Sequence, residues 1–418
     1  MPDAKARRDF AEEVVVKLRR AGFQALWAGG CVRDILLGLA PADYDVATDA
    51  TPEQAMATLP YRSLAIGASF GVVKVRHPRQ KGNEVEIATF RSDLAYVDGR
   101  RPVGVVFSSP REDAERRDFT LNGLFMDPTA GDVIDYVGGR ADLEARLLRA
   151  IGEPAARFEE DKLRLLRAVR FASRFDLAIE PATSAAIRAM APQIIVVSPE
   201  RIAQELRKML EHPSRARSVE ALMDLGLMAA VLPPLAAIDV PLRDRVVRTL
   251  DLLPPDAGFP LALAVLLLPA TPAVADDLCR RLKLSNAERE RVVWLVARRD
   301  DLVGARALPA SRLKRLLASP GVDELLELHR ADALATTGDS GHVDYCRHYL
   351  EHQPAGPIDP PPLLTGNDLI RHGLRPGAEF AAILERVRDA QLESRIRDKD
   401  EALAFVDREM EAATDDRG

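Results

Sequence analysis

The chain has 418 residues, 47% of them hydrophobic and 29% charged, so it can bury a large core and is long enough for two to three domains. Its three cysteines lie far apart without a CxxC pair, which argues against a disulfide framework and against a zinc site. With 58 basic and 64 acidic residues the formal charge is −6, which argues against a uniformly basic nucleic-acid-binding surface.

The N-terminal segment Ala4–Gly22 has apolar residues at helical spacing between charged ones. This spacing predicts an amphipathic helix, and the segment lacks the apolar core that a signal peptide would have. The longest apolar run, Phe259–Leu268, contains a proline and is too short to span a bilayer, which favours a buried helix. The sequence therefore predicts a protein without a membrane partner, in the reducing cytoplasm.

Residues from about 23 to 140 alternate short β-rich runs with turns, which is typical of a small α/β arrangement on one sheet. The expected strands are Gln24–Ala28, Tyr44–Thr48, Gly71–His77, Glu84–Phe90 and Val133–Tyr136, with helices near Cys31–Leu37 and Pro52–Thr58. From Asp142 onward apolar residues recur at three- and four-residue spacing, so the rest is predicted to be nearly all helical.

A glycine pair, Gly29 and Gly30, follows the first expected strand and opens the next helix, with Arg33 close behind. Paired glycines let backbone N–H groups approach a phosphate, a helix N-terminus favours negative charge, and an arginine adds donors. Taken alone, a glycine turn beside a surface arginine is the more common explanation.

Two acidic residues, Asp43 and Asp45, lie on the second expected strand, which places residues two apart on the same face. Magnesium prefers carboxylate oxygens together with substrate phosphates, and a pair of such ions can hold both oxygens of an in-line phosphoryl transfer. An isolated Asp-x-Asp is more often a solvated surface pair, so this interpretation depends on the glycine pair upstream.

A third carboxylate is available from Glu84 or Glu86, which alternation sets on one face of their strand, opposite Val85 and Ile87. Either of them could join a metal site. A solvated strand glutamate is the alternative for both.

The segment Glu160–Phe171 is predicted to be helical, with Asp161 and Arg164 on one face. A carboxylate accepts from the amino group of cytosine or adenine, while a guanidinium donates to their acceptor ring nitrogen. Uracil and guanine would leave buried polar groups unpaired, at about 1–3 kcal/mol each. The simpler alternative is an i,i+3 salt bridge between these two residues on an amphipathic helix.

The order of these motifs, together with Arg116–Asn122 and Val197–Ile202, resembles the class II nucleotidyltransferases, which comprise CCA-adding enzymes and bacterial poly(A) polymerases. The resemblance covers nearly the whole chain and implies an α+β fold. A polymerase-β-like nucleotidyltransferase head with a small mixed sheet (1–140) would precede an all-α neck (141–215), body (216–330) and tail (331–418). The stretch from Leu363 to Gly377 resembles the tRNA-gripping end of bacterial members.

The resemblance also implies roles for individual residues. Asp43 and Asp45 would hold Mg²⁺, with Glu86 as the third catalytic carboxylate. Nucleotide binding would fall to Gly29, Gly30, Arg33, Arg117, Asp161, Arg164, Arg167 and Arg170, the last two continuing a helix face towards phosphate. The Val197–Ile202 motif is interpreted as positional.

The implied function is template-independent addition of CMP and AMP from CTP and ATP to the 3′ end of tRNA, with release of pyrophosphate. The basic loop Asp98–Pro102 favours full CCA or A addition, since relatives restricted to CC addition lack such a loop. A poly(A) polymerase is a first alternative, but its typical Gly-Arg-Arg-Phe stretch is replaced by Gly67–Phe70. A non-catalytic RNA-binding protein is a second, and it predicts loss of a metal ligand or nucleotide-selecting residue, of which none is lost.

Overall fold

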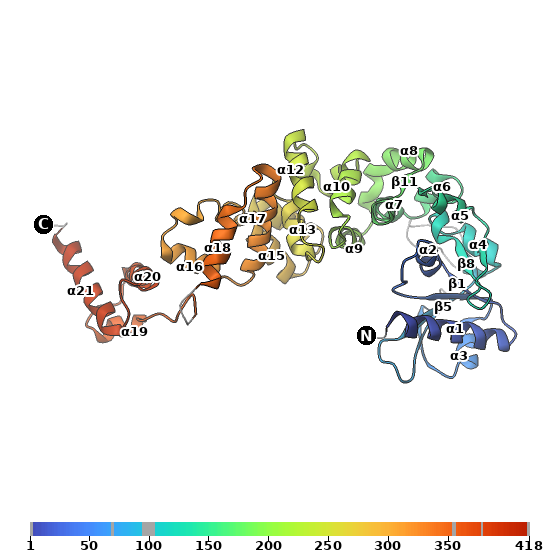
Figure 1. The fold of residues 1–418 in the computed structure, drawn as a ribbon, viewed down its shortest axis with the longest axis horizontal. Helices are drawn as coiled ribbons and strands as arrows, with labels where there is room; N and C mark the ends of the chain where they lie inside the picture. Colours follow the sequence, from blue (N-terminus) through green and yellow to red (C-terminus); the bar gives the residue numbers. More distant parts are fainter. Residues whose placement is uncertain (1–2, 68–70, 94–104, 353–356, 378, 416–418) are drawn as a thin grey trace. The chain divides into compact units, whose positions relative to one another are not determined.

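The structure is a computed structural model that describes residues 3–67, 71–93, 105–352, 357–377 and 379–415 (Figure 1). The chain divides into two compact units, Met1–Ala237 with Arg280–Leu284, and Ile238–Cys279 with Ser285–Gly418. The division into head, neck, body and tail stays a prediction. Two segments that bear on the choice among family members lie outside the described residues. They are Asp98–Pro102 and the last three residues of Gly67–Phe70.

The first unit is built on a seven-stranded sheet with the strand order β3-β4-β5-β2-β1-β8-β9. Its strands are β1 (Ala25–Ala28), β2 (Asp45–Thr48), β3 (Arg62–Gly67), β4 (Val72–Arg76), β5 (Glu84–Thr89), β8 (Leu124–Met126) and β9 (Val133–Asp135). Strands β2 and β5 run parallel, and the other neighbouring pairs are antiparallel. The predicted α+β class with a small mixed sheet in the N-terminal part is confirmed.

The five strands expected from the sequence correspond to β1, β2, β4, β5 and β9. Strands β3 and β8 were not predicted. Strand β8 has only three residues and directly follows a 3₁₀ turn at Thr120–Asn122, while β3 is an edge strand that leaves Leu64 exposed. Neither segment shows the alternation of apolar and polar residues that marks a half-buried strand.

Two further short pairs of strands lie outside the main sheet. They are β6 (Arg91–Asp93) with β7 (Val105–Phe107) and β10 (Leu147–Leu148) with β11 (Ala178–Ile179).

Helices pack on the sheet and continue beyond it within the first unit (Figure 1). They are α1 (Ala4–Arg20), α2 (Gly30–Leu36), α3 (Pro52–Thr58), α4 (Pro110–Glu115), α5 (Gly139–Glu144), α6 (Pro154–Glu160), α7 (Leu163–Phe175), α8 (Pro181–Met190), α9 (Pro199–Leu210), α10 (Arg215–Asp224) and α11 (Leu227–Val231). The predicted amphipathic N-terminal helix is present as α1, and it buries Phe10, Val14 and Leu18. Helix α2 packs against β1 and β8, which brings the glycine pair next to the strand that carries Asp45.

In the described part of the second unit the regular elements are helices, joined by turns and loops. Its helices are α12 (Val240–Asp251), α13 (Phe259–Leu266), α14 (Pro272–Arg281, ending in the first unit), α15 (Asn286–Ala297), α16 (Ala310–Leu317), α17 (Val322–Thr336), α18 (Gly341–Glu351), α19 (Gly366–Arg371), α20 (Glu379–Leu392) and α21 (Lys399–Asp415). Helices α19 to α21 bury an apolar cluster of their own that includes Leu369, Val387 and Val406.

The apolar run from Phe259 forms α13 and is buried, as expected from its composition. Among the described residues, no helix combines the length and the apolar character needed to cross a bilayer.

Candidate active site

A cavity of about 450 Å³ lies inside the first unit, where α2, the segment around Asp118 and α7 meet. It is lined by Gly29, Gly30, Arg33, Asp45, Arg116, Arg117, Asp118, Asn122, Asp161, Leu163, Arg164, Arg167, Phe171 and Arg201. Eight of the residues singled out from the sequence therefore share one cavity. Asp43, Glu86 and Arg170 do not line it.

Asp45 begins strand β2 and lies opposite Glu86 in the parallel register with β5, so their side chains project from the same face of the sheet. Both residues line a smaller cavity of about 190 Å³, which shares Asp45, Arg116 and Arg117 with the larger one. Asp43 precedes β2 and is exposed. Asp45 and Glu86 are therefore neighbours, whereas Asp43 lines neither cavity, and the metal site formed by these carboxylates stays a prediction.

The surroundings of Asp45 disfavour its negative charge. Although the residue reaches solvent, the cleft walls withdraw water from its carboxylate, and the carboxylates of Glu86 and Asp43 oppose it further, so its pKa is raised to about 6. Arg117 and Lys74 offset part of this effect. A carboxylate whose acidic neighbours are only partly compensated is suited to a divalent cation, whose charge would relieve the remaining repulsion.

Glu84 and Glu86 differ in their partners. Glu86 is bound to Lys74 at 3.1 Å, whereas Glu84 is bound to Arg76 at 2.7 Å and to Lys74 at 3.3 Å. Only Glu86 lies directly opposite Asp45. Within the described residues, no three His, Cys, Asp or Glu side chains are already gathered in an arrangement that could hold a metal. The role of Glu86 as a third carboxylate stays a prediction.

Gly29 shows why the first motif needs a glycine. Its φ is +67°, and a Cβ on it would lie 2.6 Å from Nη1 of Arg117. That nitrogen donates to the carbonyl of Asn122 at 3.0 Å, and Nε and Nη2 of Arg117 donate to Asp113 at 3.2 and 2.9 Å. The glycine therefore leaves room for a guanidinium that is fixed at the cavity wall.

Arg33 is buried, with 6% of its surface exposed, instead of lying free on the surface. Its Nε and Nη2 donate to Asp34 at 2.9 and 2.6 Å, and its Nη1 donates to Oδ1 of Asn122 at 2.7 Å. The guanidinium also lies 4.3 Å from the ring centre of Phe175 on α7. These contacts hold it at the cavity in one orientation.

Arg167 is fixed by Asp118, which accepts from its Nε and Nη2 at 2.8 and 2.6 Å. Burial alone would raise the pKa of Asp118, but the charge of Arg167 and the hydrogen bonds from Asn122 and Arg167 outweigh burial and lower the pKa to about 2. The Asp118 carboxylate therefore stays ionised and holds Arg167 at the cavity.

Asp161 does not lie on the helix that the sequence predicted. Helix α6 ends at Glu160 and α7 begins at Leu163, and Asp161 between them has an extended backbone with φ −150° and ψ 105°. Its Oδ1 accepts from the backbone N–H of Leu163 at 3.0 Å. Such a side-chain bond to the nearby backbone competes with helix formation and accounts for the break.

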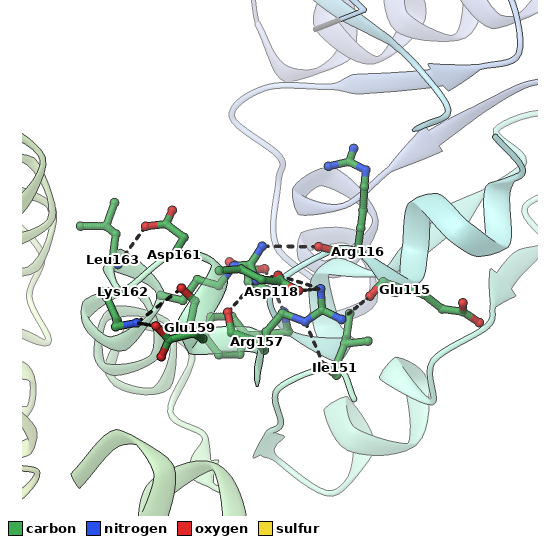
Figure 2. Close-up of polar contacts among 12 residues, drawn as sticks. Glu115, Arg116, Asp118, Ile151, Arg157, Glu159, Asp161, Lys162 and Leu163 are labelled. Carbon is green, nitrogen blue, oxygen red and sulfur yellow. Dashed lines mark hydrogen bonds and ion pairs between the residues drawn. The ribbon is translucent and has the colours of Figure 1, made fainter. Parts of the chain in front are cut away.

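The simpler alternative of an Asp161–Arg164 salt bridge is not what the structure forms. Asp161 is bound by Arg201 of α9, with Nη2 to Oδ2 at 2.7 Å and Nη1 to Oδ1 at 3.2 Å. Arg164 instead donates to Glu160 at 2.5 Å and to the carbonyls of Arg157 and Arg116 at 2.8 and 3.5 Å. Figure 2 shows Asp161 with its bond to Leu163, apart from the contacts around Arg157 and Asp118. The two side chains proposed to select the base are thus held separately at one cavity.

Arg170 is placed differently from expectation. It is buried, its Nε donates to Glu205 of α9 at 2.6 Å, and its guanidinium lies 4.1 Å from the ring centre of Phe171. Arg170 therefore points to α9 and not to the cavity. Most faces of α7 are packed against other elements, α9 and α10 among them, and the position three residues after Arg167 lies on the face that packs against α9. The sequence did not predict that Asp118, Asn122 and Arg201 line the site, although all three lie in the motifs Arg116–Asn122 and Val197–Ile202, the second of which was interpreted as positional.

Two stretches of the chain match known protein families. Residues 25–149 match the family described as the poly A polymerase head domain, and residues 176–238 match a probable RNA and SrmB-binding site of polymerase A. The CCA-adding enzyme of Streptococcus pyogenes serotype M2 is 33% identical over 387 residues, which is 92% of each chain. The chain belongs to the CCA-adding enzyme family.

Other CCA-adding enzymes extend this result. That of Geobacillus stearothermophilus is 42% identical over 231 residues, which cover 55% of this chain and only 56% of the relative. The crystal structure of the Bacillus stearothermophilus CCA-adding enzyme in complex with CTP superposes with a TM-score of 0.80 at 28% identity, over 98% of this chain and 99% of that chain. A Thermotoga maritima CCA-adding enzyme complexed with tRNA shares the fold, with a TM-score of 0.67 at 22% identity. Family members are nucleotidyltransferases, a class that generally uses divalent metal.

Proposed function

We propose that this chain adds CMP and AMP, from CTP and ATP, to the 3′ end of tRNA without a nucleic-acid template, and so builds or repairs the CCA terminus. The observation that carries the proposal is the cavity in which Asp161 and Arg164, each held by its own partner, face the same space as Asp45. A base-selecting pair and an acidic catalytic residue then act on one nucleotide.

Base selection is proposed to depend on hydrogen-bond complementarity. Asp161 would accept from the exocyclic amino group of cytosine or adenine, and Arg164 would donate to the acceptor ring nitrogen. Uracil and guanine present a carbonyl and a ring N–H at these points, so both would leave buried groups unpaired. The same two residues would thus admit C and A and reject U and G.

The triphosphate would be held by the arginines of the cavity. Arg33, Arg117 and Arg167 line it, and each guanidinium is oriented by Asp34, Asp113 or Asp118 respectively. Fixed donors of this kind bind phosphate oxygens without having to be ordered first. Gly29 and Gly30 leave room for phosphate beside them.

Asp43 and Asp45 are the proposed ligands of Mg²⁺, with Glu86 beside them. The fit rests on the donor chemistry, because carboxylate oxygens suit Mg²⁺ and the crowding of like charges around Asp45 favours a cation. Bound there, Mg²⁺ would stabilise negative charge on the reacting phosphate. In the proposed reaction the terminal hydroxyl of tRNA loses its proton to solvent and its oxygen attacks the α-phosphorus. The new phosphodiester bond forms as the bond to the β-phosphate breaks, which releases pyrophosphate.

We propose the cytoplasm as the location of this activity, because tRNA, CTP and ATP occur together there.

The direct test uses three transcripts of one tRNA. The first ends before CCA, the second ends after the first two C residues, and the third carries the complete CCA. Each is incubated with the protein, Mg²⁺, CTP and ATP, and the products are identified by mass analysis. We expect C, C and A on the first, a single A on the second and nothing on the third. A long A tract or no addition would contradict the proposal.

A further inference from the structure

We propose that Arg201 is a positioning residue for base selection, acting by fixing the carboxylate of Asp161. The inference rests on the proposed function and concerns a residue outside the nucleotide-selecting pair. Arg201 lies on α9, forty residues after Asp161, and its side chain lines the same cavity.

The contact between the two side chains has a fixed geometry. Both outer nitrogens of Arg201 meet the carboxylate, at 2.7 Å for Nη2–Oδ2 and 3.2 Å for Nη1–Oδ1. Paired parallel bonds of this kind set the plane of the carboxylate as well as its distance, which a lysine ammonium cannot do. The side chains are largely covered, with 22% of Arg201 and 16% of Asp161 exposed.

Asp161 needs such an external support because of its backbone. It lies in the break between α6 and α7, and within the described part of the chain its carboxylate has one other hydrogen bond, from the N–H of Leu163 to Oδ1. A single bond to one oxygen leaves the carboxylate free to turn about the line of that bond. Arg201 removes this freedom and leaves lone pairs available for a base.

A second consequence concerns Arg164. Without Arg201, the carboxylate of Asp161 would lose its ionic partner, and Arg164 lies three residues away at the same cavity. Pairing of Asp161 with Arg164 would occupy the acceptor and the donor that are meant for the base. Arg201 on one side and Glu160 on the other therefore keep the two recognition groups apart.

The test compares Arg201→Gln and Arg201→Lys with a matched control, Arg207→Gln. Arg207 lies on the same helix and pairs with Glu211 at 3.6 Å, outside the cavity. Competition of CTP against UTP on a tRNA lacking CCA should show that Arg201→Gln lowers the ratio of kcat/KM values about tenfold, equivalent to roughly 1.4 kcal/mol. Arg201→Lys should lose less, and Arg207→Gln should match the wild type.

Two further measurements separate positioning from direct contact with the nucleotide. In an Asp161→Ala background, Arg201→Gln should cause no further loss of discrimination, because the group it orients is gone. Inhibition by pyrophosphate, which carries no base, should be unchanged in Arg201→Gln. Circular dichroism and thermal unfolding establish that each variant is folded before its kinetics are compared.

Equal slowing of CTP and UTP addition, additive effects in the Asp161→Ala background, or weaker inhibition by pyrophosphate would overturn the inference, since each indicates a phosphate contact or a structural role. These results remain distinct from failure of the proposed function, in which the wild-type protein itself would add neither C nor A.

Discussion

Asp118 and Arg167, which are 49 residues apart, form an ion pair with Nη2 of Arg167 2.6 Å from Oδ2 of Asp118. The other oxygen of Asp118 accepts from Nδ2 of Asn122 at 2.9 Å, and Oδ1 of Asn122 accepts from Arg33 at 2.7 Å. A continuous chain of hydrogen bonds thus joins α2 to α7 along the cavity wall. Two arginines proposed to bind the triphosphate are oriented through one carboxylate and one amide.

Replacing Asp118 by asparagine should destabilise the protein at neutral pH. The folded-state pKa of Asp118 is about 2, below the ordinary value of 3.8, so the ionised carboxylate stabilises the fold above pH 4, and this contribution is lost as the pH falls towards 2. The shift corresponds to about 2 kcal/mol, and leaving Arg167 without its partner adds to the loss.

Urea unfolding of Asp118→Asn at pH 7 measures this effect, with Asp176→Asn as the control. Asp176 is an exposed aspartate with a positive φ of 56°, a conformation that asparagine tolerates. The control should change stability by less than about 0.5 kcal/mol. If Asp118→Asn were equally mild, the Asp118–Arg167 pair would not contribute to the fold.

Asp45→Asn should remove nucleotide addition and at the same time stabilise the metal-free protein. The raised pKa of Asp45, about 6, means that its ionised form is disfavoured in the fold, so the wild type loses stability as the pH rises above the ordinary value of 3.8 and through 6. The neutral asparagine avoids this cost. The gain should be about 1 kcal/mol or less, because the carboxylate reaches solvent.

Thermal unfolding in EDTA at pH 8 and at pH 4 checks the sign, since the Tm difference between Asp45→Asn and wild type should be positive at pH 8 and vanish at pH 4. Mg²⁺ should raise the Tm of the wild type more than that of the variant. Retention of more than about a hundredth of the addition rate would contradict a metal-binding role, because metal electrostatics contribute several kcal/mol.

The local parts of the site follow from the sequence, and the long-range parts do not. The glycine pair, β2 with Asp45, and β5 with Glu86 were predicted because strand alternation and turn residues act over a few positions. The pairing of Asp161 with Arg201 joins residues forty apart, and no spacing rule indicates it. The break at Asp161 was missed because the apolar spacing of Leu163, Leu166 and Val169 does not show where their helix begins.

Arg164→Ala should reduce discrimination before it reduces chemistry. The substitution removes the donor that distinguishes the acceptor ring nitrogen of C or A from the N–H of U or G, while Asp161 stays bound to Arg201. The loss of a charge-assisted bond implies roughly 1.5–3 kcal/mol less preference for the correct nucleotide, or about ten- to a hundredfold in the ratio of kcat/KM values. Competition between CTP and UTP measures it. Equal slowing of both substrates would assign Arg164 to phosphate binding instead.

Gly29→Ala tests whether the first motif requires glycine for its backbone alone or also for Arg117. The positive φ of 67° predicts strain of about 1–3 kcal/mol for alanine. The added Cβ would also lie 2.6 Å from Nη1 of Arg117, and that nitrogen cannot move without losing its bond to the carbonyl of Asn122. We therefore expect a lower Tm and a higher KM for CTP.

Gly131→Ala is the matched control, because Gly131 has a φ of +79° with no neighbouring atom within 4 Å of its added Cβ. It should show the backbone strain without the change in KM. In an Arg117→Ala background the clash is absent, so the stability loss from Gly29→Ala should fall to that of Gly131→Ala. If the loss were the same with and without Arg117, the contact would be irrelevant and glycine would be required at this position for its backbone conformation only.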